Sequence, residues 1–352
     1  MGCLTVQLPS GRGEIREQKL REFADYLNGL QAQIGFKVSA RGWAYLLEQQ
    51  GAITKAEFDQ VETVVNECRT KGVLPVDFVA EEPARGFSGV EVPEDDTPEQ
   101  YMASLLRGAL NAEEYYTPNW WKGEPYYIQM VVEKIDLMTL FAPVCQLYHI
   151  PIATSKGWSS ILQRAEYARR FREAEEKGLK CVLLYCGDHD PDGLRISEFL
   201  QSNLYDIQNI TWGDGTEGYD PGGLTILRFG LNFDFIQANG LTWIDNLVTG
   251  SGRDLGSPSH PNHRMPYVQD YLPRYGRRKC EANALVVIPV AARALCESAI
   301  VRYLGVGARG RFETKRQAVR DRLTGFRERT GLDEAIQSAI DQAEEGDEGG
   351  ET

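Results

Sequence analysis

The sequence predicts an α/β fold: a mostly parallel, doubly wound sheet with helices on both faces, preceded by a smaller helical domain. From residue 126 onward, apolar runs typical of strands alternate with helical patterns. Residues 181–186 form a continuous apolar run, as expected of a strand buried on both faces of a parallel sheet. Before residue 80 only helical periodicity recurs, and 352 residues suffice for about two domains.

Residues 1–80 are expected to form the N-terminal domain, with helices at residues 14–30, 39–50 and 55–71. Ser39 and Thr54 are candidate N-caps for the second and third helices. An extended stretch then begins near residue 74. Three short helices followed by extended chain are typical of a winged-helix DNA-binding domain, although any small helical domain fits the same pattern.

Composition divides the rest of the chain into three parts. Residues 81–125 combine a linker rich in Asp, Glu, Pro and Gly with a dense aromatic segment. Residues 126–305 form the α/β domain, and residues 306–352 contain a basic helix and an acidic tail that we expect to be disordered. The expected strands are 127–132, 150–153, 181–186 and 225–229, and the expected helices are 137–148, 159–177, 193–203, 291–303 and 315–330.

The charge of the chain is uneven. With 38 basic and 51 acidic residues the net charge is −13, but residues 301–330 hold nine basic and three acidic side chains. A bound nucleic acid experiences the local field, so DNA or RNA stays possible as a partner. No apolar run approaches the roughly 18 residues that cross a bilayer, no signal-peptide stretch opens the chain, and its seven cysteines are dispersed. We therefore expect a cytoplasmic protein without a membrane partner.

Acidic residues follow two of the expected strands. Glu133 and Lys134 come after the first strand, and Asp188 and Asp190 come after the third. Because the carboxyl ends of parallel strands meet at one edge of a sheet, the three acids are expected to converge there. Carboxylates suit Mg²⁺, and Lys134 could neutralise the charge of a phosphate. The alternative is a structural turn, because Asp-x-Asp-Pro-x-Gly also favours turns.

These residues together resemble a Toprim domain. The resemblance rests on Glu133-Lys134, on a glycine after the second expected strand (Gly157), and on the Gly-Asp-x-Asp-Pro-x-Gly stretch at residues 187–193. Among Toprim proteins the likeness is to the topoisomerase VI A subunit and the meiotic double-strand-break transesterase, which carry a winged-helix domain first. It covers roughly residues 39–305, thinly between residues 80 and 126. It implies Mg²⁺-dependent DNA cleavage by a homodimer.

In that family an Arg-x-x-x-Tyr stretch of the winged-helix domain carries the nucleophile. Arg41 and Tyr45 match it, so the resemblance implies that Tyr45 attacks a DNA phosphate with help from Arg41. Alternatively, Tyr45 is a core residue on the apolar face of its helix. The family also implies an ATPase partner of the topoisomerase B type, since this chain has no Gly-x-x-x-x-Gly-Lys-Ser/Thr phosphate loop.

Several positions depart from the family pattern. Ala44 stands where an aromatic residue is common, Ser159 replaces a proline, and Asn283 replaces an acid in the stretch that starts at Glu281. These differences bring the chain nearer to free-standing Toprim relatives. Three functions stay open: DNA cleavage by tyrosine transesterification, hydrolysis by a Toprim nuclease, for example in defence against foreign DNA, and a non-catalytic DNA-binding or assembly role.

Overall fold

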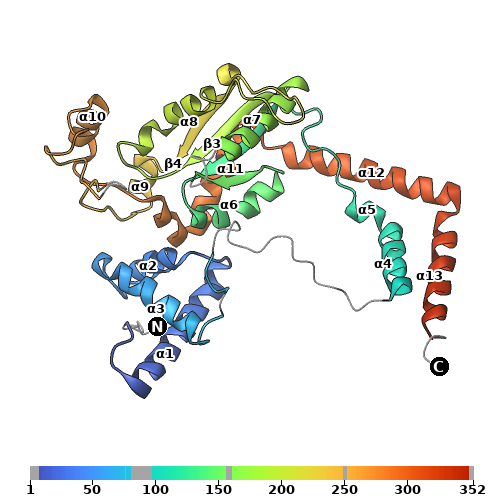
Figure 1. Ribbon diagram of the computed structural model, residues 1–352, viewed down its shortest axis with the longest axis horizontal. Coiled ribbons are helices and arrows are strands. Elements are labelled where there is room, and N and C mark those ends of the chain that lie inside the picture. Colours follow the sequence, from blue (N-terminus) through green and yellow to red (C-terminus); the bar gives the residue numbers. More distant parts are fainter. Residues whose placement is uncertain (1–7, 76, 81–96, 156–160, 249–251, 349–352) are drawn as a thin grey trace. The chain divides into compact units, whose positions relative to one another are not determined.

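A computed structural model describes residues 8–75, 77–80, 97–155, 161–248 and 252–348 (Figure 1). The chain divides into two compact units. Unit 1 comprises residues 1–83 and 124–304, and unit 2 comprises residues 84–123 and 305–352. The N-terminal helices and the sheet therefore belong to one compact unit, whereas the second unit is assembled from two segments far apart in the sequence.

Unit 1 contains a four-stranded parallel sheet in the order β2-β1-β3-β4. Its strands are β1 (Tyr126–Val132), β2 (Ile152–Thr154), β3 (Lys180–Cys186) and β4 (Thr225–Gly230). The helices α6 (Ile135–Leu147) and α11 (Pro289–Leu304) pack on one face, and α7 (Ile161–Glu176) and α8 (Ile196–Tyr205) pack on the other (Figure 1). The expected α/β fold with a parallel sheet is confirmed.

The two central strands are buried because helices cover both of their faces. From Tyr127 to Val132 in β1, and from Cys181 to Cys186 in β3, every side chain is buried. This burial explains why both strands are mainly apolar and do not alternate, and the one polar side chain among these residues, Gln129 of β1, donates to the Tyr167 carbonyl at 3.0 Å. The strands β2 and β4 form the edges of the sheet and are only partly buried.

Three helices precede the sheet: α1 (Gly13–Ile34), α2 (Ala40–Gln49) and α3 (Phe58–Thr70), the last after a short turn η1 (Lys55–Glu57). Ser39 caps α2, and its hydroxyl also donates to the buried carboxylate of Asp136 in α6, with 2.6 Å between the oxygens. This contact fixes α2 against the sheet. Residues 8–75 and 77–80 contain no strand, so they do not include the strands of a wing.

Beyond β3, unit 1 also contains short elements, two of them before β4 and three after it. They are η4 (Gly193–Arg195), η5 (Pro221–Gly223), α9 (Phe233–Ala238), α10 (Pro266–Tyr275) and η6 (Ala282–Val287). The last of these, η6, packs against both α2 and α6. It therefore lies between the N-terminal helices and the sheet.

Unit 2 consists of α4 (Pro98–Leu110), α5 (Ala112–Tyr115), α12 (Ala308–Thr330) and α13 (Leu332–Glu348). The acidic tail differs from its expected disorder, because α13 continues to Glu348. Ile336 and Ile340 explain the difference, since they bury their side chains against Ala103 of α4. Within the described ranges, no helix is long and apolar enough to cross a membrane.

Candidate functional site

The candidate site lies where the order of the strands reverses. The chain moves from β1 to the edge strand β2, then returns across β1 to β3, so the reversal lies between β1 and β3. Ligands of open α/β sheets bind at the carboxyl ends of the strands at this point. Val132 is paired with Cys186, and the backbone N–H of Glu133 donates to the Cys186 carbonyl at 3.0 Å. Glu133 and the loop after β3 therefore leave the sheet side by side.

Glu133 contacts the first residue of the aspartate pair. Its Oε2 accepts a hydrogen bond from the backbone N–H of Asp188 at 2.7 Å. Gly187 makes this approach possible, because a Cβ there would lie 2.7 Å from the same oxygen and 2.5 Å from the hydroxyl of Tyr185. Burial and the negative charge of Asp188 raise the pKa of Glu133 to about 7.

Asp190 belongs to a tight turn at the same edge. Its Oδ1 accepts from the backbone N–H of Gly193 at 2.6 Å. A side chain at Gly193 would place its Cβ 2.3 Å from the Asp188 carbonyl, so the turn requires glycine. Burial raises the pKa of Asp190 to about 6. The Asp-x-Asp-Pro-x-Gly stretch therefore forms a turn, which was the structural alternative to a metal site. The same turn also places the half-buried carboxyl group of Asp190 close to Asp188.

His189, between the two aspartates, has a structural environment. Its ring lies among Phe233, Trp243, Tyr271 and Tyr275, and its Nδ1 is 3.0 Å from the Leu231 carbonyl. Burial lowers its pKa to about 4. We infer that this neutral ring anchors the loop that carries the aspartates.

Lys134 compensates one of the acids. Its Nζ lies 3.0 Å from both carboxylate oxygens of Asp188 and 3.7 Å from Glu281 Oε2. The backbone N–H of Ala282 also donates to Asp188 Oδ1 at 2.7 Å. By contrast, no Lys or Arg of the described residues forms an ion pair with Glu133 or Asp190. The excess negative charge of the site is therefore concentrated on Glu133 and Asp190.

The donor set fits a divalent cation in its chemistry, although not as a finished cage. Across the described part of the chain, no three His, Cys, Asp or Glu side chains already form a metal-binding group. Mg²⁺ commonly uses only one or two carboxylates, with water and phosphate oxygens as its other ligands. Glu133 and Asp190 are half-buried acids whose pKa values are raised chiefly by desolvation, and a cation beside them would favour their ionised forms. They are the residues that would hold Mg²⁺.

Tyr45 lies inside the same unit and not on its surface. The side chain is 2% exposed, and its hydroxyl donates to Glu281 at 2.5 Å. Burial and the charge of Glu281 raise the pKa of Tyr45 far above its ordinary value. Arg41 lies beside this pair, with its Nε 3.8 Å from the Glu281 carboxylate. In this conformation Tyr45 keeps its proton and is inaccessible to a DNA phosphate.

Glu281 connects Tyr45 to the candidate metal edge. Although burial opposes it, Lys134, the Tyr45 hydroxyl and Lys279 lower the pKa of Glu281 to about 2. His189 and Cys280 form two backbone hydrogen bonds with each other, although they are about 90 residues apart in the sequence. These bonds bring Glu281 next to the loop that carries Asp188 and Asp190. The sequence marks Glu281 only through the family stretch that it begins.

Arg228 was not identified as a site residue from the sequence. From β4, its guanidinium donates to the backbone carbonyls of Gly193 and Asp188, each at 2.9 Å, and of Leu231 at 2.7 Å. These bonds hold the loop that carries both aspartates. The sequence does contain one indication of its role: Arg228 is the only charged residue of a mainly apolar strand. A charged side chain that is half-buried in a sheet needs several hydrogen-bond partners.

Gly157 and Ser159, which contribute to the Toprim resemblance and to its departures, lie outside the described residues. Comparisons with protein-family models, with curated proteins and with solved structures found no match to this chain.

Proposed function

We propose that the protein is a Mg²⁺-dependent nuclease that hydrolyses phosphodiester bonds of DNA at the edge formed by Glu133, Asp188 and Asp190. The observation that carries this proposal is the placement of two half-buried carboxyl groups with raised pKa values, which form no ion pair with any described lysine or arginine, at the strand-order reversal of a parallel sheet. Such an edge is where α/β proteins bind ligands, and a carboxylate set without counter-ions suits a divalent cation.

The residues at the edge have separate roles in this proposal. Bound Mg²⁺ supplies charge that polarises a phosphate and stabilises the leaving oxygen. Glu133 and Asp190 hold the ion, while Arg228 and Gly193 fix the position of Asp190 through the loop backbone. Lys134 holds the carboxylate of Asp188 in place, and it lies close enough to the edge to move towards a phosphate when the ion pair opens.

DNA is the substrate that the rest of the chain favours. The Toprim resemblance of residues 126–305 implies DNA as the substrate. The same resemblance implies a winged-helix domain before the sheet, of which the described residues contain three helices but no wing strand, and α2 joins the candidate edge through Tyr45 and Glu281. The local basic charge of residues 301–330 also suits a polyanion.

A second candidate is tyrosine transesterification of the topoisomerase VI A type. It is favoured by one observation: the Tyr45 hydroxyl bonds to Glu281, which lies 3.7 Å from Lys134, and Lys134 in turn pairs with Asp188. This candidate requires Tyr45 to leave its buried position. It also requires the homodimer and the ATPase partner that the resemblance to topoisomerase VI implies. We rank it second because a buried, protonated tyrosine is a poor nucleophile.

Cleavage of supercoiled plasmid DNA, with Mg²⁺ or with EDTA, tests both candidates. Hydrolysis predicts free DNA ends, activity lost in Glu133→Gln and Asp190→Asn, and activity retained in Tyr45→Phe. The matched control is Asp192→Asn, an exposed aspartate in the same turn. A covalent protein–DNA adduct that disappears in Tyr45→Phe would establish the second candidate instead. DNA binding without any Mg²⁺-dependent cleavage would favour the non-catalytic DNA-binding or assembly role.

A further inference from the structure

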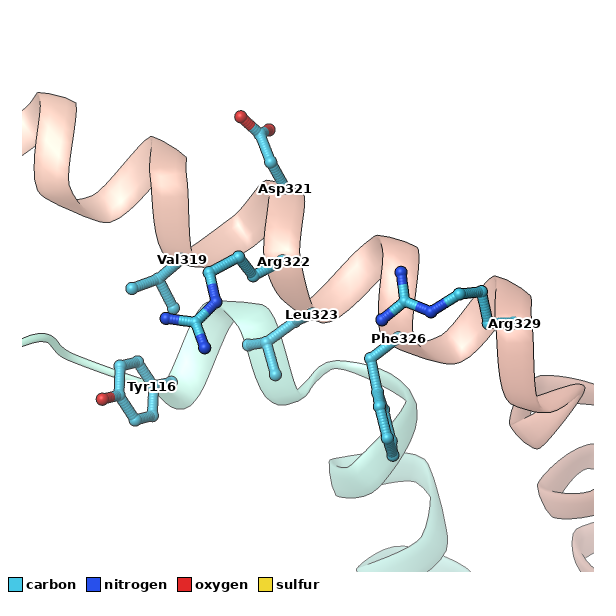
Figure 2. Close-up of a pocket in the computed structure, with 7 residues that line it drawn as sticks. All are labelled: Tyr116, Val319, Asp321, Arg322, Leu323, Phe326 and Arg329. Atoms are coloured by element: carbon cyan, nitrogen blue, oxygen red, sulfur yellow. The ribbon is translucent and has the colours of Figure 1, made fainter.

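Unit 2 contains a groove that the candidate site does not use. It has a volume of about 610 Å³ and lies between α12 and the segment that follows α5 (Figure 2). Tyr116 comes from that segment, and the other lining residues come from α12: Val319, Asp321, Arg322, Leu323, Phe326 and Arg329. All of them belong to one compact unit, so the groove is a local feature of unit 2.

Two aromatic rings of this groove are unusually exposed. Tyr116 is 56% exposed and Phe326 is 51% exposed, although both are large side chains that favour burial. Elsewhere in unit 2 an aromatic pair is packed, since Trp120 and Phe312 are buried with their ring centroids 4.5 Å apart. Exposed aromatic faces can stack on unpaired bases of either DNA or RNA.

The same helix is strongly basic. The helix α12 carries eight basic and three acidic side chains, a net charge of +5 in a chain whose net charge is −13. Arg327 is neutralised by ion pairs with Glu113 and Asp333. Arg322 and Arg329 are exposed, and neither forms an ion pair with a carboxylate in the part of unit 2 that the structure describes.

Asp321 is the acidic residue among the lining side chains. Figure 2 shows its carboxylate directed away from Tyr116 and from the facing segment. Its Oδ1 accepts from the side-chain amide of Gln317 at 2.8 Å. The facing side of the groove is therefore left to Arg322 and the two rings.

We propose that this groove binds single-stranded nucleic acid, with Arg322 and Arg329 contacting phosphates and with Tyr116 and Phe326 stacking on bases. Alternating cationic and aromatic side chains are the usual means of binding single strands without sequence preference. An acidic peptide could pair with the same arginines, but it would have no need of two exposed rings. The inference shares the nucleic-acid partner of the proposed function, but binding here requires neither Mg²⁺ nor cleavage.

Fluorescence anisotropy of a labelled oligothymidylate with the full chain, in EDTA, tests the proposal. We expect Arg322→Gln/Arg329→Gln to weaken binding and to lower the magnitude of the slope of log K against log salt by about 1.4, which is about 0.7 for each phosphate contact of a single strand. The matched control is Arg309→Gln/Arg320→Gln, which removes the same charge from α12 outside the groove and should keep near-native affinity. Equal loss in both double variants would overturn the assignment to this groove.

The stacking role has its own pair of variants. Phe326→Leu should weaken oligothymidylate binding by roughly 5- to 150-fold, whereas Phe326→Tyr keeps a ring and should bind normally. Unchanged affinity in Phe326→Leu, together with displacement of the probe by oligoglutamate, would overturn the proposal in favour of an acidic peptide. Because the assay contains EDTA, failure of DNA cleavage would reject the proposed nuclease without affecting this result.

Discussion

Lys134 Nζ lies 3.0 Å from both carboxylate oxygens of Asp188, and this pair decides how charge is distributed at the candidate site. The lysine that was expected to meet a phosphate instead neutralises one of the expected metal ligands. Glu133 and Asp190 keep the raised pKa values of buried acids without a counter-ion. A cation that enters the edge would therefore compete with Lys134 for Asp188 and meet no competing ion pair at the other two acids.

Replacement of Lys134 by methionine should destabilise the protein and strengthen its response to Mg²⁺. The substitution leaves Asp188 without its ammonium partner, and breaking a buried pair in this way costs about 3 kcal/mol of unfolding free energy. Mg²⁺ should then raise the melting temperature of Lys134→Met more than that of the native protein. Thermal unfolding with EDTA and with Mg²⁺ measures both effects.

The matched control for this variant is Lys279→Met. Lys279 also pairs with Glu281, at 3.4 Å, but it makes no contact with Asp188. Its replacement should change the Mg²⁺ response less than Lys134→Met does, because Lys279 acts on the site only through its charge near Asp190. An equal Mg²⁺ response in the native protein and in Lys134→Met would refute competition between the lysine and the cation.

Ionisation of Glu133 and Asp190 should lower stability as pH rises when divalent ions are absent, whereas the low pKa of His189 acts in the opposite direction below about pH 6.5. In the folded protein the pKa values of Glu133 and Asp190 are about 7 and about 6, above their ordinary values of 4.5 and 3.8. Between the unfolded and folded pKa values, the folded state binds more protons at these two residues than the unfolded state does. The free energy of unfolding therefore decreases as pH rises through the folded pKa values. For Glu133 alone the change is roughly 3 kcal/mol of unfolding free energy.

Melting curves at about pH 5 and about pH 8 check this dependence. Mg²⁺ should stabilise the protein more at the higher pH, because ionised carboxylates are its ligands. In a Glu133→Gln/Asp190→Asn variant the decline between the two pH values should largely disappear. An equal change of stability over this range in the native protein and in this variant, both in EDTA, would contradict the raised pKa values.

Replacement of Arg228 by lysine should loosen the aspartate loop. Lysine keeps the charge but cannot donate to three separate carbonyls at once, so buried acceptors lose their partners. Each unsatisfied group costs about 1–3 kcal/mol, and Mg²⁺ affinity measured by calorimetry should fall as well. Arg195→Lys, at an exposed arginine paired with Glu198, is the control and should change neither quantity appreciably. Native Mg²⁺ affinity in Arg228→Lys would show that the loop does not depend on this side chain.

The parts of the fold and site that follow from local pattern could be predicted from the sequence. Apolar runs revealed β1 and β3, and their following acids identified Glu133 and Asp188 as neighbours, which the 2.7 Å hydrogen bond bears out. Periodicity and cap residues revealed α2 and α3 within a few residues. These features depend on residues close together in the chain or on the regular geometry of a parallel sheet.

Features that depend on long-range contacts could not be predicted. Glu281 reaches the site through the bridge between His189 and Cys280, and Arg228 reaches it because β4 lies beside β3. The ion pair of Lys134 with Asp188 depends on both side-chain conformations, which spacing does not determine. The helix α13 could not be predicted for a similar reason, since Ile336 and Ile340 pack on Ala103 of α4, far away in the sequence.

Diffraction from crystals grown with Mn²⁺, a substitute for Mg²⁺ that gives an anomalous signal, tests the central claim most directly. We predict a peak at the carboxyl edge of β1 and β3, within coordinating distance of the Glu133 and Asp190 carboxylates. The peak should be absent from the Glu133→Gln variant. A native crystal with no peak at this edge, at Mn²⁺ concentrations that fill other sites, would contradict the account.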